Sequence, residues 1–200
     1  MPEWFRRFAE IPGVTYASDP DIDRSMLPGH DSVPKVERWS FEGESTESVM
    51  WGETSQSPAG QWSSQIPEKP SLKTLVSHLK EVLELPGDGG DYHFAIQGCV
   101  SELWKLRRSD PGVPAAVEDL CWLDIRLIQA LTHTIRHESS EETNYYQVVA
   151  FERLIELYER DGFIREALEV AKLAKDFGQG GNDFDRLSGT LSTLEAEDAS

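Results

Sequence analysis

The chain has 200 residues, a formal net charge of -17 and 38% hydrophobic residues. This length suits one ordinary domain with an appendage, and the acidic charge excludes nucleic-acid binding through a clustered excess of lysine and arginine. No apolar run is long enough to cross a bilayer, and the amino terminus lacks the uninterrupted apolar stretch of a secretory signal. We therefore expect a cytoplasmic protein that does not bind membranes.

Residues 1–70 form an arm rich in Ser, Pro, Gly and Glu, in which we expect little regular structure. The stretch 11–70 has too few aliphatic residues to bury much surface alone. Short apolar segments around Trp39 and Trp51 predict at most two strands joined through residues 42–46. Because an isolated hairpin is marginally stable, it would depend on packing against the rest of the chain.

Tryptophan is unusually frequent in this arm for a linker. We take Trp39, Trp51 and Trp62 as candidate anchors, which either cover the protein's own helices or bind a partner. The segment from Pro2 to Glu10 is typical of a short helix that docks on the body of the protein.

Apolar residues at helical spacing predict a helical domain over residues 71–197 with about six helices. Ser71 can cap the first, and a capping pattern of Ser139 with Glu142 precedes the fourth. The expected helices span about 71–85, 91–108, 114–136, 140–160, 164–177 and 183–196. Short connections make consecutive helices antiparallel, so the fold class is all-α, a short stack of helical hairpins.

Both cysteines, Cys99 and Cys121, lie within apolar helical patterns. This placement favours small, buried, reduced side chains over a disulfide or a reactive nucleophile. Each lies at a similar distance from the Asp110-Pro111-Gly112 break, so we expect the two to lie close together on neighbouring helices.

Residues 148–181 resemble a tetratricopeptide repeat, a helix-turn-helix unit in which small and large apolar residues alternate at defined points. Ile155 and Ala171 depart from the pattern. The matching positions are Phe151, Leu154, Tyr158, Gly162, Ile164, Ala167, Leu168 and Ala174. Shifting the pattern back by 51 residues places Leu103 under Leu154 and suggests a degenerate preceding unit.

The resemblance implies a binding groove, because the inner face of the first helix in such units receives an extended peptide or a partner's helix. The corresponding positions here are Val149, Glu152, Glu156 and Glu159. Members that hold a terminal carboxylate place Lys and Asn on this face, whereas the face here is acidic. A basic or amphipathic polypeptide is the partner that these charges favour.

A histidine pair offers the strongest alternative chemistry. His133 and His137 are four residues apart, which on a helix places two imidazoles on one face, with Glu138 and Glu141 nearby as further ligands for a divalent metal. Histidines in a last turn also stabilise the carboxyl end of a helix.

The sequence thus favours a non-enzymatic interaction protein without a cofactor: an adaptor, a chaperone-like protein or a neutralising protein that binds a polypeptide through an acidic helical groove. No nucleophile elbow, phosphate loop or dinucleotide motif is present. Two alternatives stay open, a small metal-dependent hydrolase using His133 and His137 and a structural subunit that oligomerises through the arm.

Overall fold

The computed structural model describes residues 11, 13–14, 20–41, 44–136 and 145–198. Within these ranges, with η marking a 3-10 helix, the elements are η1 Arg24–Met26, β1 Lys35–Phe41, β2 Glu44–Met50, α2 Pro58–Ser63, α3 Leu72–Leu83, α4 Gly89–Leu106, α5 Val113–Ala130, η2 Thr132–Ile135, α6 Val149–Arg160, α7 Ile164–Asp176 and α8 Gly181–Asp198.

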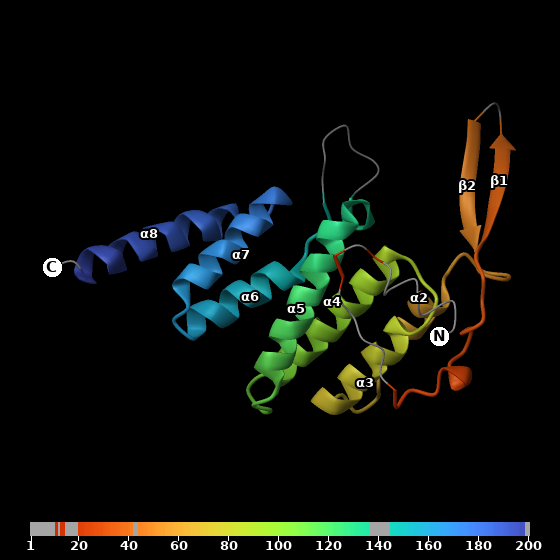
Figure 1. Cartoon of the computed structure of the whole chain (residues 1–200), viewed down its shortest axis with the longest axis horizontal. Coiled ribbons are helices and arrows are strands. Elements are labelled where there is room, and N and C mark those ends of the chain that lie inside the picture. Colours follow the sequence, from red (N-terminus) through yellow and green to blue (C-terminus); the bar gives the residue numbers. More distant parts are fainter. Residues whose placement is uncertain (1–10, 12, 15–19, 42–43, 137–144, 199–200) are drawn as a thin grey trace.

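The helices form a stack in which each packs mainly on its neighbours in the chain. Figure 1 shows the order running from α2 and α3, through α4 and α5, to α8 and the carboxyl terminus at the far end. The predicted all-α fold of antiparallel helical hairpins is confirmed. Among the described helices, none combines the length and the apolar character needed to cross a membrane.

Two capping boxes fix the starts of α3 and α4. The Ser71 side chain accepts from the backbone of Thr74, whose hydroxyl in turn accepts from the backbone of Ser71, which confirms Ser71 as the predicted cap. Asp88 and Asp91 make the same reciprocal pair at α4. Each box satisfies backbone N–H groups that a helix start otherwise leaves without partners.

The third predicted helix, over about 114–136, is longer than the helix in the structure. α5 ends at Ala130, and the chain continues as η2. The change from α5 to η2 places Ile135 in the core, where it is fully buried. It also brings η2 against the first turn of α4, where a Cβ on Gly89 would lie 2.6 Å from the Thr134 methyl. The close approach therefore requires glycine at that position.

The predicted start of the fourth helix is also wrong. The capping pattern of Ser139 and Glu142 lies outside the described residues, and α6 begins at Val149. Side-chain amides from distant helices and loops hold this start: the Val148 N–H donates to Gln179 Oε1 at 2.9 Å, and the Val149 N–H donates to Gln97 Oε1 at 3.1 Å.

Helices α4 and α6 lie alongside one another and run in the same direction, because their contacts advance along both helices together. Gln97, in the amino-terminal half of α4, contacts Val149, the first residue of α6. Arg107, which directly follows α4, contacts Glu156 further along α6. The contact between Gln97 and Val149 joins residues that are 52 apart in the sequence. This separation is close to the 51-residue shift that places Leu103 under Leu154. This geometry supports the degenerate repeat, which stays a prediction.

An ion pair and several hydrogen bonds attach the described part of the arm to the helices. Arg24 of η1 forms an ion pair with Glu84, a fully buried residue at the carboxyl end of α3. Ser57, the cap of α2, donates to Asp91 of α4 at 2.7 Å, and the Ala59 N–H donates to the Pro86 carbonyl at 3.0 Å. Helix α2 therefore packs as part of the helical body.

The β1–β2 hairpin stands apart from the helices (Figure 1). Its register pairs Lys35 with Met50 and Phe41 with Glu44. Strand pairing therefore covers part of the connection that the sequence analysis placed at 42–46.

Candidate functional site

The four residues of the predicted groove lie on one helix, α6, but not in equal environments. Glu152 and Glu156 are exposed, Glu159 is partly exposed, and Val149 is partly buried against the core. The opposite face of α6 is buried through Phe151, Leu154, Ile155 and their neighbours. The acidic side chains therefore point outward, as the helical spacing indicates.

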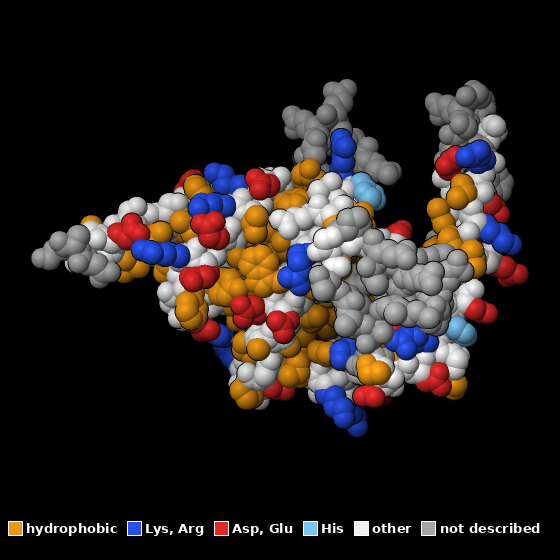
Figure 2. All heavy atoms as spheres, viewed as in Figure 1, with side chains coloured by type: hydrophobic (Ala, Val, Ile, Leu, Met, Phe, Trp, Pro, Cys, Tyr) orange, Lys and Arg blue, Asp and Glu red, His pale blue; other side chains and the backbone are white. Residues whose placement is uncertain are grey.

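Each of the three glutamates lies beside an arginine of the same chain. Arg153 Nη1 lies 2.9 Å from Glu152 Oε1 and 3.5 Å from Glu156 Oε2, and Arg107 approaches Glu156 at 3.9 Å. Arg186 of α8 pairs with Glu159, with one contact of 2.8 Å. Figure 2 shows acidic and basic side chains interspersed over these carboxyl-terminal helices. The face is thus locally balanced in charge rather than uniformly acidic.

Trp104 joins the carboxyl end of α4 to this ion-pair surface. The guanidinium carbons of Arg107 and Arg153 lie 4.6 and 5.1 Å from the centre of its ring. Cation–π contacts of this kind hold both guanidinium groups over Trp104, between α4 and α6. Trp104 is buried, as its position in the apolar helical pattern predicts, whereas that pattern does not indicate the arginine partners of the glutamates.

A group of exposed apolar side chains lies beside the amino end of α6. Phe94 is 48% exposed, and its ring centre lies 6.0 Å from that of Tyr146, which is 44% exposed. Ile66, 50% exposed, borders the same small crevice as Phe94. We call Ile66, Phe94 and Tyr146 the Phe94 patch. Its members come from three separate segments of the chain.

The crevice beside the Phe94 patch lies between α3 and α4 and has a volume of about 40 Å³. Its walls are mainly apolar, with Leu75 and Leu79 on α3. Gly98, one turn after Phe94, has nothing within 4 Å of the position that a Cβ would occupy. The surface beside Phe94 is therefore open, with room for an incoming side chain.

The Phe94 patch is held in place by hydrogen bonds to its backbone. The Tyr146 N–H donates to the Ile135 carbonyl at 2.8 Å, and Gln179 Nε2 donates to the Tyr146 carbonyl at 3.0 Å. Because Gln179 also caps Val148, the segment between the patch and the acidic face of α6 is fixed at both ends. Tyr146 thus links the Phe94 patch to the start of α6.

The titratable groups near the crevice do not form a nucleophile. Burial raises the pKa of the Cys99 thiol to about 12, and its Sγ donates to the Leu75 carbonyl. Burial also raises the pKa of Cys121. A reactive cysteine needs the opposite shift. Both cysteines are buried free thiols, on neighbouring helices as expected.

The three candidate tryptophan anchors have different environments. Trp62 is partly buried against α3: its Nε1 donates to Glu81 at 3.1 Å, and its ring centre lies 5.9 Å from that of His78. Trp51 borders the same surface hollow as Trp62. Trp39 lies in β1, in a position whose side chain is outside the described part. Trp62 therefore covers the protein's own helices.

Only one member of the predicted histidine pair lies within the described residues. His133 lies exposed in η2, after α5 has ended, and His137 lies outside the described residues. Within the described ranges, no group of three or more His, Cys, Asp or Glu side chains is arranged to hold a metal ion.

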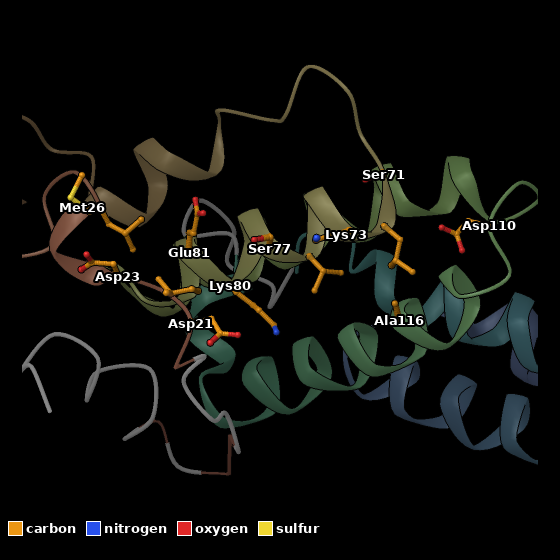
Figure 3. A pocket seen from close by; sticks show the side chains of 14 residues that line it. Asp21, Asp23, Met26, Ser71, Lys73, Ser77, Lys80, Glu81, Asp110 and Ala116 are labelled. Carbon is orange, nitrogen blue, oxygen red and sulfur yellow. The ribbon is translucent and has the colours of Figure 1, made fainter.

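A hollow of about 1040 Å³ lies between the arm and α3 (Figure 3). Figure 3 shows Lys73 and Lys80 on α3 facing a space that Asp21 and Asp23 border from the arm, and Asp110 closes the far end. Both signs of charge line this hollow, so it selects no single class of ligand.

A buried polar pair joins α4 to α5. Helical periodicity did not predict it. His93 Nδ1 lies 2.7 Å from Asp124 Oδ1, and both side chains are almost completely inaccessible. The sequence signal was an Asp within an otherwise apolar stretch of α5. Because solvent does not reach the pair, we assign it to the structure of the core rather than to catalysis.

In comparisons with known proteins, no family model, no curated protein and no solved structure matches the chain.

Proposed function

We propose that this protein is a non-enzymatic interaction module, an adaptor, chaperone-like or neutralising protein, that binds a partner polypeptide. The docking face combines the Phe94 patch with the adjoining outer face of α6. The partner segment is amphipathic, with a large apolar residue that packs on Phe94 and basic residues that lie along Glu152 and Glu156.

The observation that carries this proposal is the exposure of Phe94 within an apolar group. Burying a fully exposed large apolar side chain contributes about 1.5–3 kcal/mol, and covering the exposed half of Phe94 contributes roughly half of that. Aromatic anchors near the centre of an interface typically supply much of its binding energy. Because the backbone around Tyr146 is already fixed, little ordering cost opposes binding.

The charges have a different role from the one that the sequence indicates. Since Arg107, Arg153 and Arg186 already lie beside the three glutamates, a basic partner must exchange ion pairs rather than meet free carboxylates. Such exchange adds little affinity at an exposed surface. The net charge of -17 instead favours basic partners through faster association.

The test compares two serine variants of exposed apolar residues in the full-length protein. Phe94→Ser removes the proposed anchor, and Leu194→Ser changes an exposed residue near the end of α8 as the matched control. The partner is a protein captured by the wild type and by Leu194→Ser and lost with Phe94→Ser. With that protein purified, Phe94→Ser is expected to weaken binding about tenfold or more. Equal capture and equal affinity for both variants refute the proposal.

A second candidate function follows from the β1–β2 hairpin, whose outer edges face no other element in Figure 1. Val36 and Val49 pair across it and are both exposed. Open strand edges favour pairing with another chain, as in a structural subunit that oligomerises through its arm. A mass by light scattering that matches the single chain excludes this candidate.

A further inference from the structure

A second hollow, of about 560 Å³, lies where the carboxyl end of α6 meets the amino end of α5. Gly162 has a φ of +83°, a conformation that favours glycine. It reverses the chain and leaves Phe163 53% exposed just before α7 begins. The proline-containing start of α5, with Pro114, forms the opposite wall. The hollow therefore has apolar walls and one exposed aromatic ring at its rim.

All charged residues that line this hollow are acidic. Glu118, Asp161 and Glu166 come from α5, from the turn after α6 and from α7, respectively, and no lysine or arginine belongs to the lining. Arg160 occupies both oxygens of Asp161, at 2.8 and 3.1 Å. Glu118 and Glu166 are left to supply the negative charge. This uniform sign distinguishes the hollow from the larger one beside the arm.

The inner wall is fixed by a chain of hydrogen bonds. Trp122 Nε1 donates to the Tyr158 hydroxyl at 2.9 Å, and that hydroxyl donates to Glu118 Oε1 at 2.6 Å. Burial and the hydrogen bond to Glu118 raise the pKa of Tyr158, and the charges of Glu118 and Glu166 add to the effect. The tyrosine ring and the Glu118 carboxylate are thus held before any ligand arrives.

We propose that this hollow receives an arginine side chain of a polypeptide partner. A guanidinium stacks on an aromatic face and bonds to carboxylate oxygens in the same plane, and it is more weakly hydrated than an ammonium. Phe163 supplies the ring, and Glu118 and Glu166 supply the carboxylates. Hollows of this size accommodate more than one side chain, so the residues flanking the arginine also contact the apolar walls.

The inference rests on the proposed function only in taking the ligand to be part of a polypeptide. The hollow includes no member of the Phe94 patch. A partner long enough to reach both surfaces would gain affinity from two linked contacts.

The test titrates the full-length, ¹⁵N-labelled protein with N-acetyl-arginine N-methylamide and follows the indole N–H signal of Trp122, which reports on Tyr158. We expect a saturable shift with a dissociation constant on the order of millimolar, as is usual for one exposed side chain. The matching citrulline compound has nearly the same shape without the charge. Free arginine, which carries an α-carboxylate, is expected to bind more weakly than the blocked compound.

Two variants of α7 locate the binding. Glu166→Gln is expected to raise the dissociation constant about two- to fivefold, the range of one exposed ion pair. Glu169→Gln, an exposed glutamate on the same helix that does not line the hollow, is expected to leave it unchanged.

Three results overturn the inference: no saturable shift, an equal shift with the citrulline compound, or an equal loss in both variants. Equal or tighter binding of free arginine overturns the assignment to a polypeptide. Phe94→Ser is expected to leave the titration unchanged. A failure of the Phe94 capture and a failure of the titration are therefore separate results.

Discussion

His93 Nδ1 and Asp124 Oδ1 lie 2.7 Å apart in the centre of the helical stack. The second polar atom of each side chain, His93 Nε2 and Asp124 Oδ2, is buried without a hydrogen-bond partner in the described part of the chain. The two side chains therefore depend on each other, because each has its one described side-chain hydrogen bond with the other.

Removing one member of this pair should destabilise the protein strongly. Asp124→Ala leaves His93 buried without its partner, and an unsatisfied buried polar group costs about 1–3 kcal/mol, more where the group is charged. Asp119→Ala, an exposed change on the same helix, should stay within about 0.5 kcal/mol. Urea denaturation of both variants measures the two free energies of unfolding. Equal values would show that the His93–Asp124 pair contributes nothing.

The same pair should give stability an unusual dependence on pH. Burial raises the pKa of Asp124, so the folded protein holds this proton more tightly than the unfolded chain. The resulting stabilisation is fully present below the unfolded carboxyl pKa of about 3.9 and is lost as the pH rises through the higher folded value. The wild type should therefore lose stability relative to Asp124→Asn as the pH rises from about 4. Denaturation curves across that range give the free energy of unfolding of the wild type minus that of Asp124→Asn. An increase of this difference with pH would contradict the prediction.

Buried and exposed residues alternate along α6, so substitutions at neighbouring positions should differ in their effect on stability. Leu154 is fully buried, and Leu154→Ala should cost about 2–5 kcal/mol. Glu156→Lys lies on the exposed face beside Arg153 and Arg107, and should cost at most about 1 kcal/mol by replacing weak attraction with repulsion. Chemical denaturation measures both. If Glu156→Lys were the more damaging change, the outer face of α6 would be assigned wrongly.

The ion pair between Arg24 and Glu84 should anchor the arm. Arg24→Met removes the basic partner of a fully buried carboxylate, and we expect a loss of about 2–3 kcal/mol. Arg38→Met breaks the exposed pair with Glu47 in the hairpin and should cost less than about 1 kcal/mol. Thermal unfolding of the two variants, read against the wild type, compares these losses. Similar shifts in Tm would mean that the buried pair adds no stability.

Local sequence was sufficient for most of the helical architecture. The cap at Ser71 and the break at Gly162 use neighbouring residues only, so a pattern read along the chain finds them. The start of α6 depends on Gln97 and Gln179, which are distant in sequence. The end of α5 depends on contacts of η2 with Gly89. Such boundaries are set by tertiary contacts, which helical periodicity does not contain.

The candidate site divides in the same way. Helical spacing placed Glu152, Glu156 and Glu159 on the exposed face correctly, but it did not find the arginines opposite them, two of which lie on other helices. Phe94 was grouped with the apolar positions of its helix. The position of Phe94 around the helix axis was the signal that could have found it. Tyr92, Ile96 and Leu103 share the buried stripe of α4, whereas Phe94 and Gly98 lie one turn apart on another side of the helix.

The neighbour-on-neighbour packing of the stack also determines how the chain can assemble. Because α5 packs on α4, α6 on α5 and α7 on α6, most of the contacts between helices close short loops, whose entropy cost is small. The helices can therefore dock one after another as they are synthesised. Helix α8 is synthesised after α7, and its docking buries Leu187 together with the surface that α7 would otherwise expose to aggregation.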